Sequence, residues 1–114
     1  MEIKISKNDD DIFLIDLSGD LNLSSSNQLK DLVMKMIEKK AEHFIINLKE
    51  VDRLNSSGIG ALIFISSTLK KLNCPLVIVV QEGPVMNALE VTRLKSYFTI
   101  ASSLKEAVSL KTPR

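Results

Sequence analysis

The sequence predicts an α/β fold, built as a mixed, mostly parallel sheet of about five strands with about four helices. Segments with the periodicity of strands alternate with segments with the periodicity of helices, in the order β-β-α-β-α-β-α-β-α. Such alternation is typical of parallel strands joined by right-handed crossovers. The first two strands are separated by only a short polar turn, which predicts one antiparallel pair. The length of 114 residues suits a single domain.

The first two strands are expected at residues 3–6 and 12–18. Residues 3–6 alternate apolar and polar side chains, as a half-buried strand does. The turn between the strands contains three adjacent carboxylates, Asp9, Asp10 and Asp11. Three such carboxylates can bind a metal, but in a turn they are usually solvated. Gly19 and Asp20 mark the end of the second strand.

The middle of the chain predicts a helix, a strand and a second helix. Residues 24–40 carry one apolar stripe at helical spacing, formed by Leu29, Leu32, Val33, Met36 and Ile37. Three serines, residues 24–26, are candidate N-caps of this helix. Residues 43–48 are almost continuously apolar, which predicts a strand covered on both faces. We expect a loop over 49–58 and a helix over about 57–72.

The last third of the chain continues the alternation. Pro75 disfavours helix at the preceding residue and therefore ends the second helix. Residues 76–80 predict a buried central strand, and Gly83-Pro84 opens a third helix. A short strand is expected over 97–100. A last helix follows to about residue 110, with Ser103 and Glu106 at the spacing of a capping box.

Composition excludes several functional classes. Lys and Arg number 15 and Asp and Glu 14, and this near balance argues against general nucleic-acid binding. A single Cys excludes an intrachain disulfide, and a single His excludes a His-rich metal site. No apolar run approaches the roughly 20 residues that span a bilayer, and the start lacks a signal peptide. We expect a cytoplasmic protein without a cofactor, a nucleic-acid partner or a membrane partner.

Catalytic residues are scarce. The sequence has no dinucleotide-binding glycine motif, no phosphate-binding P-loop and no Gly-x-Ser-x-Gly elbow. A serine nucleophile would need His43 as its base, and His43 lies at the far end of its strand from the serines. Cys74 has no Cys-x-x-Cys partner, so we expect a semi-buried structural thiol. We therefore expect that the protein is not an enzyme.

One segment stands out: Asn55-Ser56-Ser57-Gly58-Ile59-Gly60. It follows the carboxyl end of a strand and begins a helix, and function concentrates at this edge of open α/β sheets. A hydroxyl at a helix N-terminus can cap the helix, or it can carry a phosphate that the unsatisfied N–H groups stabilise. The glycines keep the first turn slim, so that a partner backbone can approach. The residues alone leave two alternatives, a plain serine cap or a phosphorylation site.

This segment resembles the Asp-Ser-Ser/Thr-Gly-Leu-Gly signature of STAS domains of the bacterial anti-sigma factor antagonist family. Two other segments are also similar to the family. Leu17-Ser18-Gly19-Asp20-Leu21-Asn22 resembles its apolar-x-Gly-Glu-Leu-Asp segment, and Ile45-Ile46-Asn47-Leu48, followed by Val51-Asp52, resembles one of its strands. The resemblance extends over essentially the whole chain. It implies the STAS fold and a single STAS domain over residues 1–114.

The resemblance implies a partner switch. The unphosphorylated protein would bind an anti-sigma factor that is also a serine kinase of the GHKL ATPase type, and so release a sigma factor. The kinase would phosphorylate Ser56, with Ser57 as second choice, binding would be lost, and a serine phosphatase would reset the switch. We expect the protein to be a monomer. The implied partner-binding residues are Asp20, Asn22, Asn55, Ser56, Ser57, Gly58 and Ile59.

Two positions depart from the family pattern. Asn55 replaces an acidic residue, and Asn22 replaces the Asp of the Gly-Glu-Leu-Asp segment. The changes either weaken the engagement of kinase, magnesium or phosphatase, or are benign, because Asn also accepts hydrogen bonds and caps helices. They motivate an alternative function, a STAS interaction module or nucleotide- or ligand-binding module in another bacterial signalling complex.

Overall fold

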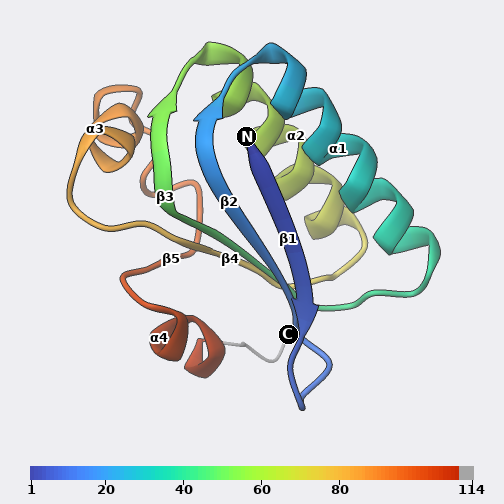
Figure 1. Ribbon diagram of the computed structural model, residues 1–114. Helices are drawn as coiled ribbons and strands as arrows, with labels where there is room; N and C mark the ends of the chain where they lie inside the picture. Colours follow the sequence, from blue (N-terminus) through green and yellow to red (C-terminus); the bar gives the residue numbers. More distant parts are fainter. Residues whose placement is uncertain (111–114) are drawn as a thin grey trace.

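The elements of the fold follow the predicted order (Figure 1). A computed structural model describes residues 1–110, so residues 111–114 of the predicted domain lie outside the described part. The elements are β1 (Glu2–Lys7), β2 (Phe13–Leu21), α1 (Leu23–Glu38), β3 (Phe44–Leu54), α2 (Ser56–Lys71), β4 (Leu76–Val79), α3 (Pro84–Val91), β5 (Ile100–Ala101) and α4 (Leu104–Ser109). The α/β prediction, with its five strands and four helices, is confirmed.

The strands form one sheet in the order β1-β2-β3-β4-β5. β1 and β2 are antiparallel, and the other neighbouring pairs are parallel. Helices α1 and α2 lie side by side on one face, and α4 lies on the opposite face near the other end (Figure 1). Because β2 and β3 are parallel, their carboxyl ends meet at the same edge of the sheet. No helix within residues 1–110 is long and apolar enough to cross a membrane.

The core has a large and a small part on the two faces of the sheet. The large part joins the sheet to α1, α2 and α3 and includes Ile15, Val33, Ile46, Leu62, Ile78 and Leu89. The small part lies under α4 and includes Ile45, Val77, Val79 and Ala107. Adjacent residues of β3, Ile45 and Ile46, therefore point into different parts of the core. This confirms the prediction that the strand is covered on both faces.

The predicted loop over residues 49–58 is wrong, because β3 continues to Leu54. In this extension every third residue is buried, at Leu48, Val51 and Leu54, instead of every second. The cause is an irregular pairing with β2, whose register shifts between Asp16 and Ser18 and again between Gly19 and Asp20. A period of three matches neither a regular strand nor a helix, so the sequence pattern did not indicate a strand.

The end of the chain also differs from the prediction. The strand predicted at 97–100 comprises only Ile100 and Ala101, because Tyr97 lies in a turn and its N–H donates to the Leu94 carbonyl at 3.0 Å. Ser103 caps α4 as expected, accepting a hydrogen bond from the Glu106 N–H. Within the described residues, the Glu106 carboxylate does not accept the hydrogen bond from the Ser103 backbone N–H that would complete a capping box. It accepts from the backbone N–H and the hydroxyl of Ser102, and the backbone bond is the main cause of its lowered pKa.

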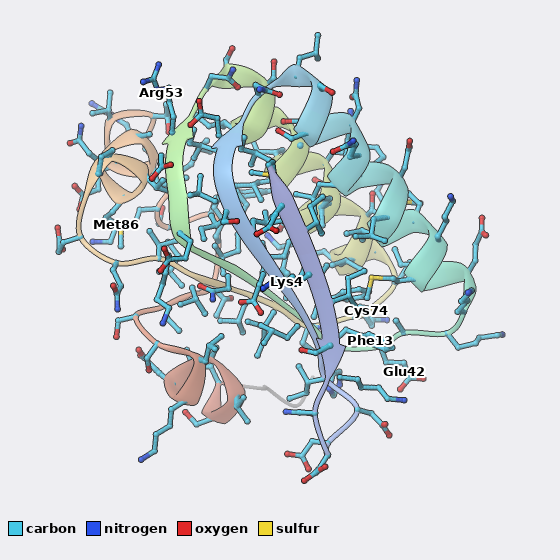
Figure 2. All side chains as sticks on the ribbon, viewed as in Figure 1. Lys4, Phe13, Glu42, Arg53, Cys74 and Met86 are labelled. Carbon is cyan, nitrogen blue, oxygen red and sulfur yellow. The ribbon has the colours of Figure 1, made fainter. Side chains whose placement is uncertain are left out.

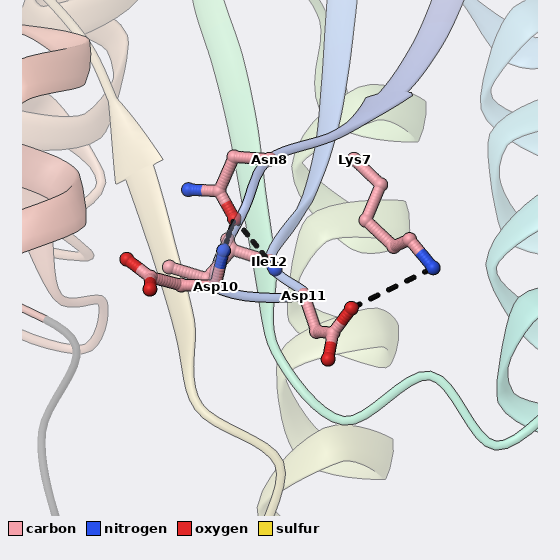
Figure 3. A network of polar contacts seen from close by, with 5 residues as sticks. All are labelled: Lys7, Asn8, Asp10, Asp11 and Ile12. Atoms are coloured by element: carbon pink, nitrogen blue, oxygen red, sulfur yellow. Dashed lines mark hydrogen bonds and ion pairs between the residues drawn. The ribbon is translucent and has the colours of Figure 1, made fainter.

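The acidic turn closes the β1–β2 hairpin (Figure 3). The Asn8 side-chain oxygen accepts hydrogen bonds from the backbone N–H groups of Asp10 and Ile12, both at 2.9 Å. Lys7 and Asp11 form an ion pair at 3.6 Å, and Asp11 takes a left-handed backbone conformation with φ 62°. The polar residues of this segment therefore serve the turn itself.

The start of α1 is capped by Asn22, and the predicted serine caps at residues 24–26 are wrong. Asn22 accepts from the Ser25 N–H at 3.1 Å, and the Ser25 hydroxyl accepts from the Asn22 N–H at 2.9 Å. Ser25 is thus the third helical residue of a capping box. The neighbouring Ser26 is equally buried, but its hydroxyl has no hydrogen-bond partner within residues 1–110.

Alanine substitutions of these two adjacent serines are expected to have opposite effects on stability. Ser25→Ala should lower the free energy of unfolding by about 1 kcal/mol, because it removes half of the capping box. Ser26→Ala should raise it by about 1 kcal/mol, because it removes a buried hydroxyl without a partner and adds a better helix former. Urea unfolding of both variants tests this. If both variants lost the same free energy of unfolding, the assignment of Ser25 to the capping box and of Ser26 to an unpartnered hydroxyl would be contradicted.

Candidate functional site

The candidate site lies where β2 and β3 end and where α1 and α2 begin. Leu21 and Leu54 are paired as the last residues of the two parallel strands. The residues that follow them, Asn22 and Asn55, are the N-caps of the two helices. Both helices therefore start at one edge of the sheet, the upper edge in Figure 1.

Asn55 caps α2 in the way that Asn22 caps α1. Its backbone is extended, and its side-chain oxygen accepts from the Gly58 N–H at 3.0 Å. An amide oxygen makes this bond as well as a carboxylate oxygen does. The two departures from the family pattern therefore keep the helix caps while removing two negative charges from this edge.

Ser56 is the first residue of α2 and is exposed. Since Asn55 supplies the cap, the alternative of a plain serine cap is wrong. The Ser56 hydroxyl makes no hydrogen bond within residues 1–110. Ser57 is half-buried and less accessible. The order in which the two serines were predicted as phosphorylation sites agrees with their exposure.

Gly58 holds α2 against the sheet. A Cβ atom there would lie 2.7 Å from Leu54 Cδ1, 2.8 Å from the Leu21 carbonyl oxygen and 2.9 Å from Leu21 Cγ. The prediction that this glycine leaves room for a partner is wrong, because Gly58 is buried and its own chain fills the space. Gly60 is exposed, with nothing within 4 Å of an added Cβ, so its surface is open.

The other predicted residues also gather at this edge. Asp20 is exposed on β2, whereas Ile59 is half-buried against the large core. Beside Asp20 on β3 lies Arg53, which sequence reasoning missed because it fell in the supposed loop. Arg53 projects from the upper end of the molecule (Figure 2). Leu23, also missed, is 65% exposed at the start of α1.

His43 lies at the opposite end of β3 from the serines. Its backbone carbonyl accepts from the Phe13 N–H, where β2 and β3 begin. The strand of 11 residues between His43 and Asn55 separates this imidazole from Ser56. The geometry therefore does not bring a histidine base to either serine.

The comparison with known families matches residues 3–107 to the STAS domain. The chain belongs to the STAS domain family. The STAS family prediction from the sequence motifs is confirmed.

Solved structures share the fold across nearly the whole chain. An anti-sigma factor antagonist from Mycobacterium paratuberculosis is 17% identical, with a TM-score of 0.87 over 96% of this chain and 92% of the other. A candidate anti-sigma factor antagonist from Thermotoga maritima is 18% identical, with a TM-score of 0.88 over 96% and 93%. The phosphorylated form of SpoIIAA from Bacillus is 18% identical, with a TM-score of 0.72 over 95% and 97%. This STAS domain therefore has the fold of anti-sigma factor antagonists.

The two glycines of the signature predict opposite responses to alanine. Gly58→Ala should lower the free energy of unfolding by about 1–3 kcal/mol, because its methyl group overlaps Leu21 and Leu54. Gly60→Ala should raise it by about 0.5–1 kcal/mol, because the site is open and alanine favours helix. Thermal unfolding measures both. Equal effects of the two changes would show that α2 does not rest on the strand ends as described.

Proposed function

We propose that this STAS domain is an anti-sigma factor antagonist, switched off by phosphorylation of Ser56. The observation that carries the proposal is the exposed Ser56 hydroxyl, which stands at the first position of α2 while Asn55 makes the cap. Adding a phosphate there removes no bond of the fold. The STAS family membership and the likeness to solved antagonists support the same function.

The edge around Ser56 suits a phosphate. The first turn of α2 presents backbone N–H groups and about half a positive charge, and α1 begins at the same edge. Arg53 adds a positive charge at the end of β3, next to the carboxylate of its cross-strand neighbour Asp20. A phosphoserine carries about −1.5 to −2 charges at pH 7, which these groups offset without refolding.

The same phosphate would oppose partner binding. Ser56, Gly60 and Phe64 follow one another at four-residue spacing on one face of α2, and Phe64 is 46% exposed. With Leu23 they offer apolar contacts next to the polar edge. The partner-binding residues are Asp20, Asn22, Asn55, Ser56, Ser57, Gly58 and Ile59. Gly58 is buried and contributes by holding the first turn of α2 against the strand ends. Burying a phosphate there would cost about 3 kcal/mol, which weakens binding by about 100-fold.

In this proposal the partners supply the chemistry. The anti-sigma factor, a serine kinase of the GHKL type, brings ATP, and a serine phosphatase removes the phosphate. The STAS domain contributes a hydroxyl and a surface, acts as a monomer in the bacterial cytoplasm, and is not itself an enzyme. The capping bonds of Asn22 and Asn55 show that both departures from the family pattern keep the helix caps. They support the interpretation that the substitutions are benign for the fold, and the nucleotide- or ligand-binding module stays the alternative function.

Incubation with Mg²⁺, ATP and a purified GHKL-type anti-sigma kinase encoded beside the gene tests the proposal. Mass spectrometry should find a single phosphate on Ser56, absent in Ser56→Ala and kept in the matched control Ser57→Ala. Calorimetry should show that Ser56→Asp binds the anti-sigma factor at least 10-fold more weakly, whereas Ser56→Ala binds normally. Phosphate on another residue, or equal affinity of Ser56→Asp, would contradict the switch.

A further inference from the structure

A cavity of about 240 Å³ lies at the opposite end of α2 from Ser56. It opens between the last turns of α2, the start of β4 and the segment before β5. The α2 residues that line it, Ser66 and Lys70, lie about 15–21 Å along the helix from the switch serine. In Figure 2, Cys74, which lines the cavity, lies in the lower half of the molecule, far from Arg53 at the upper edge.

Ser66 is the first sign of a ligand. It lines the cavity, is only 4% exposed, and its hydroxyl has no hydrogen-bond partner within residues 1–110. The next two hydroxyls on α2 are bonded, Ser67 to the Tyr97 hydroxyl at 2.9 Å and Thr68 to the Phe64 carbonyl at 2.8 Å. Its oxygen is not among the fully buried atoms without a partner, so it is accessible from the cavity that the residue lines. Ser66 is therefore a polar group that a molecule in the cavity would satisfy.

Lys70 supplies the charge, one turn after Ser66 on the same helix. Its ammonium lies 4.1 Å from the centre of the Tyr97 ring and 3.5 Å from the Tyr97 carbonyl oxygen. These contacts hold the ammonium at the cavity and use one of its three N–H donors. Every other residue described as lining the cavity is uncharged, so no carboxylate neutralises Lys70 there.

The negative end of the α2 dipole does not oppose an anion strongly. The Leu69 carbonyl accepts from the N–H groups of Leu72 and Cys74, and the Lys70 carbonyl accepts from the Asn73 N–H. Two of the last carbonyls of the helix, those of Leu69 and Lys70, thus accept hydrogen bonds within the chain. Lys70 remains the dominant charge that faces the cavity.

The remaining wall is largely apolar and includes Leu76, Val77 and Phe98. A dry apolar cavity of about 150 Å³ holds a benzene molecule, so the present volume accommodates a ring with a small polar substituent. We propose that this cavity binds a small monocarboxylate with a compact apolar or aromatic body. The carboxylate meets Lys70 and Ser66, and the body lies against Phe98 and Leu76. The proposal is independent of the partner switch at Ser56.

Titration of the full chain with sodium benzoate, followed by ¹H–¹⁵N NMR, tests the proposal. Saturable shifts are expected at the amides of residues 66, 70, 74, 76, 77 and 97–99. Benzamide, which has the same shape without the charge, should bind at least 10-fold more weakly at equal ionic strength. Equal binding of the two compounds, or no saturable shift at these residues, would overturn the proposal.

Variants separate the specific site from general charge attraction. Lys70→Gln should weaken benzoate binding at least 10-fold. Lys71→Gln removes the same charge from the next residue, which is exposed and does not line the cavity, and should leave binding unchanged. Ser66→Ala should weaken binding several-fold in a folded protein, since it removes only an unpartnered hydroxyl. An equal loss in Lys70→Gln and Lys71→Gln would contradict the site.

Discussion

The contact of Gly58 with the ends of β2 and β3 is the constraint on which the functional edge depends. Parallel pairing places Leu21 beside Leu54, and α2 rests so closely on both that no Cβ fits at Gly58. This contact sets the height and direction of the first turn of α2. The same pairing puts the start of α1 next to it, so two helix N-termini share one edge. The glycine at position 58 is thus required by the packing of α2 on the strand ends.

The division of tasks between Asn55 and Ser56 follows from that geometry. The extended backbone at Asn55 turns its side-chain oxygen back to the Gly58 N–H and makes it the cap. The next residue then stands on the outside of the first turn, with its hydroxyl in solvent. A group that carries no structural bond can be modified without loss of stability. In the proposed switch, the phosphate therefore acts on the surface that a partner meets.

Much of this arrangement could be predicted from periodicity and turn residues. The apolar stripe placed both ends of α1 within two residues, and Gly83-Pro84 marked the start of α3. The extension of β3 could not be predicted, because register shifts bury Leu48, Val51 and Leu54 at intervals of three. The cap of α1 was predicted at serines 24–26 and a serine cap of α2 was left open, since Asn and Ser cap equally well and only the backbone at Asn22 and Asn55 decides. Arg53 was missed because it lies in the part of β3 that was predicted as a loop. Ser66 was missed because its place in the cavity depends on the folded structure and leaves no pattern in the sequence.

The central claim is that phosphate at Ser56 changes the surface of this STAS domain and leaves its fold intact. The most direct measurement compares the chain carrying phosphoserine at position 56 with the unmodified chain, by ¹H–¹⁵N NMR and urea unfolding. Shift changes should be confined to the ends of β2 and β3 and the first turns of α1 and α2. The free energy of unfolding should change by less than about 1 kcal/mol, the scale of a charge at a helix N-terminus. Shifts that spread along α2 to Leu69, or a loss of several kcal/mol, would contradict the claim.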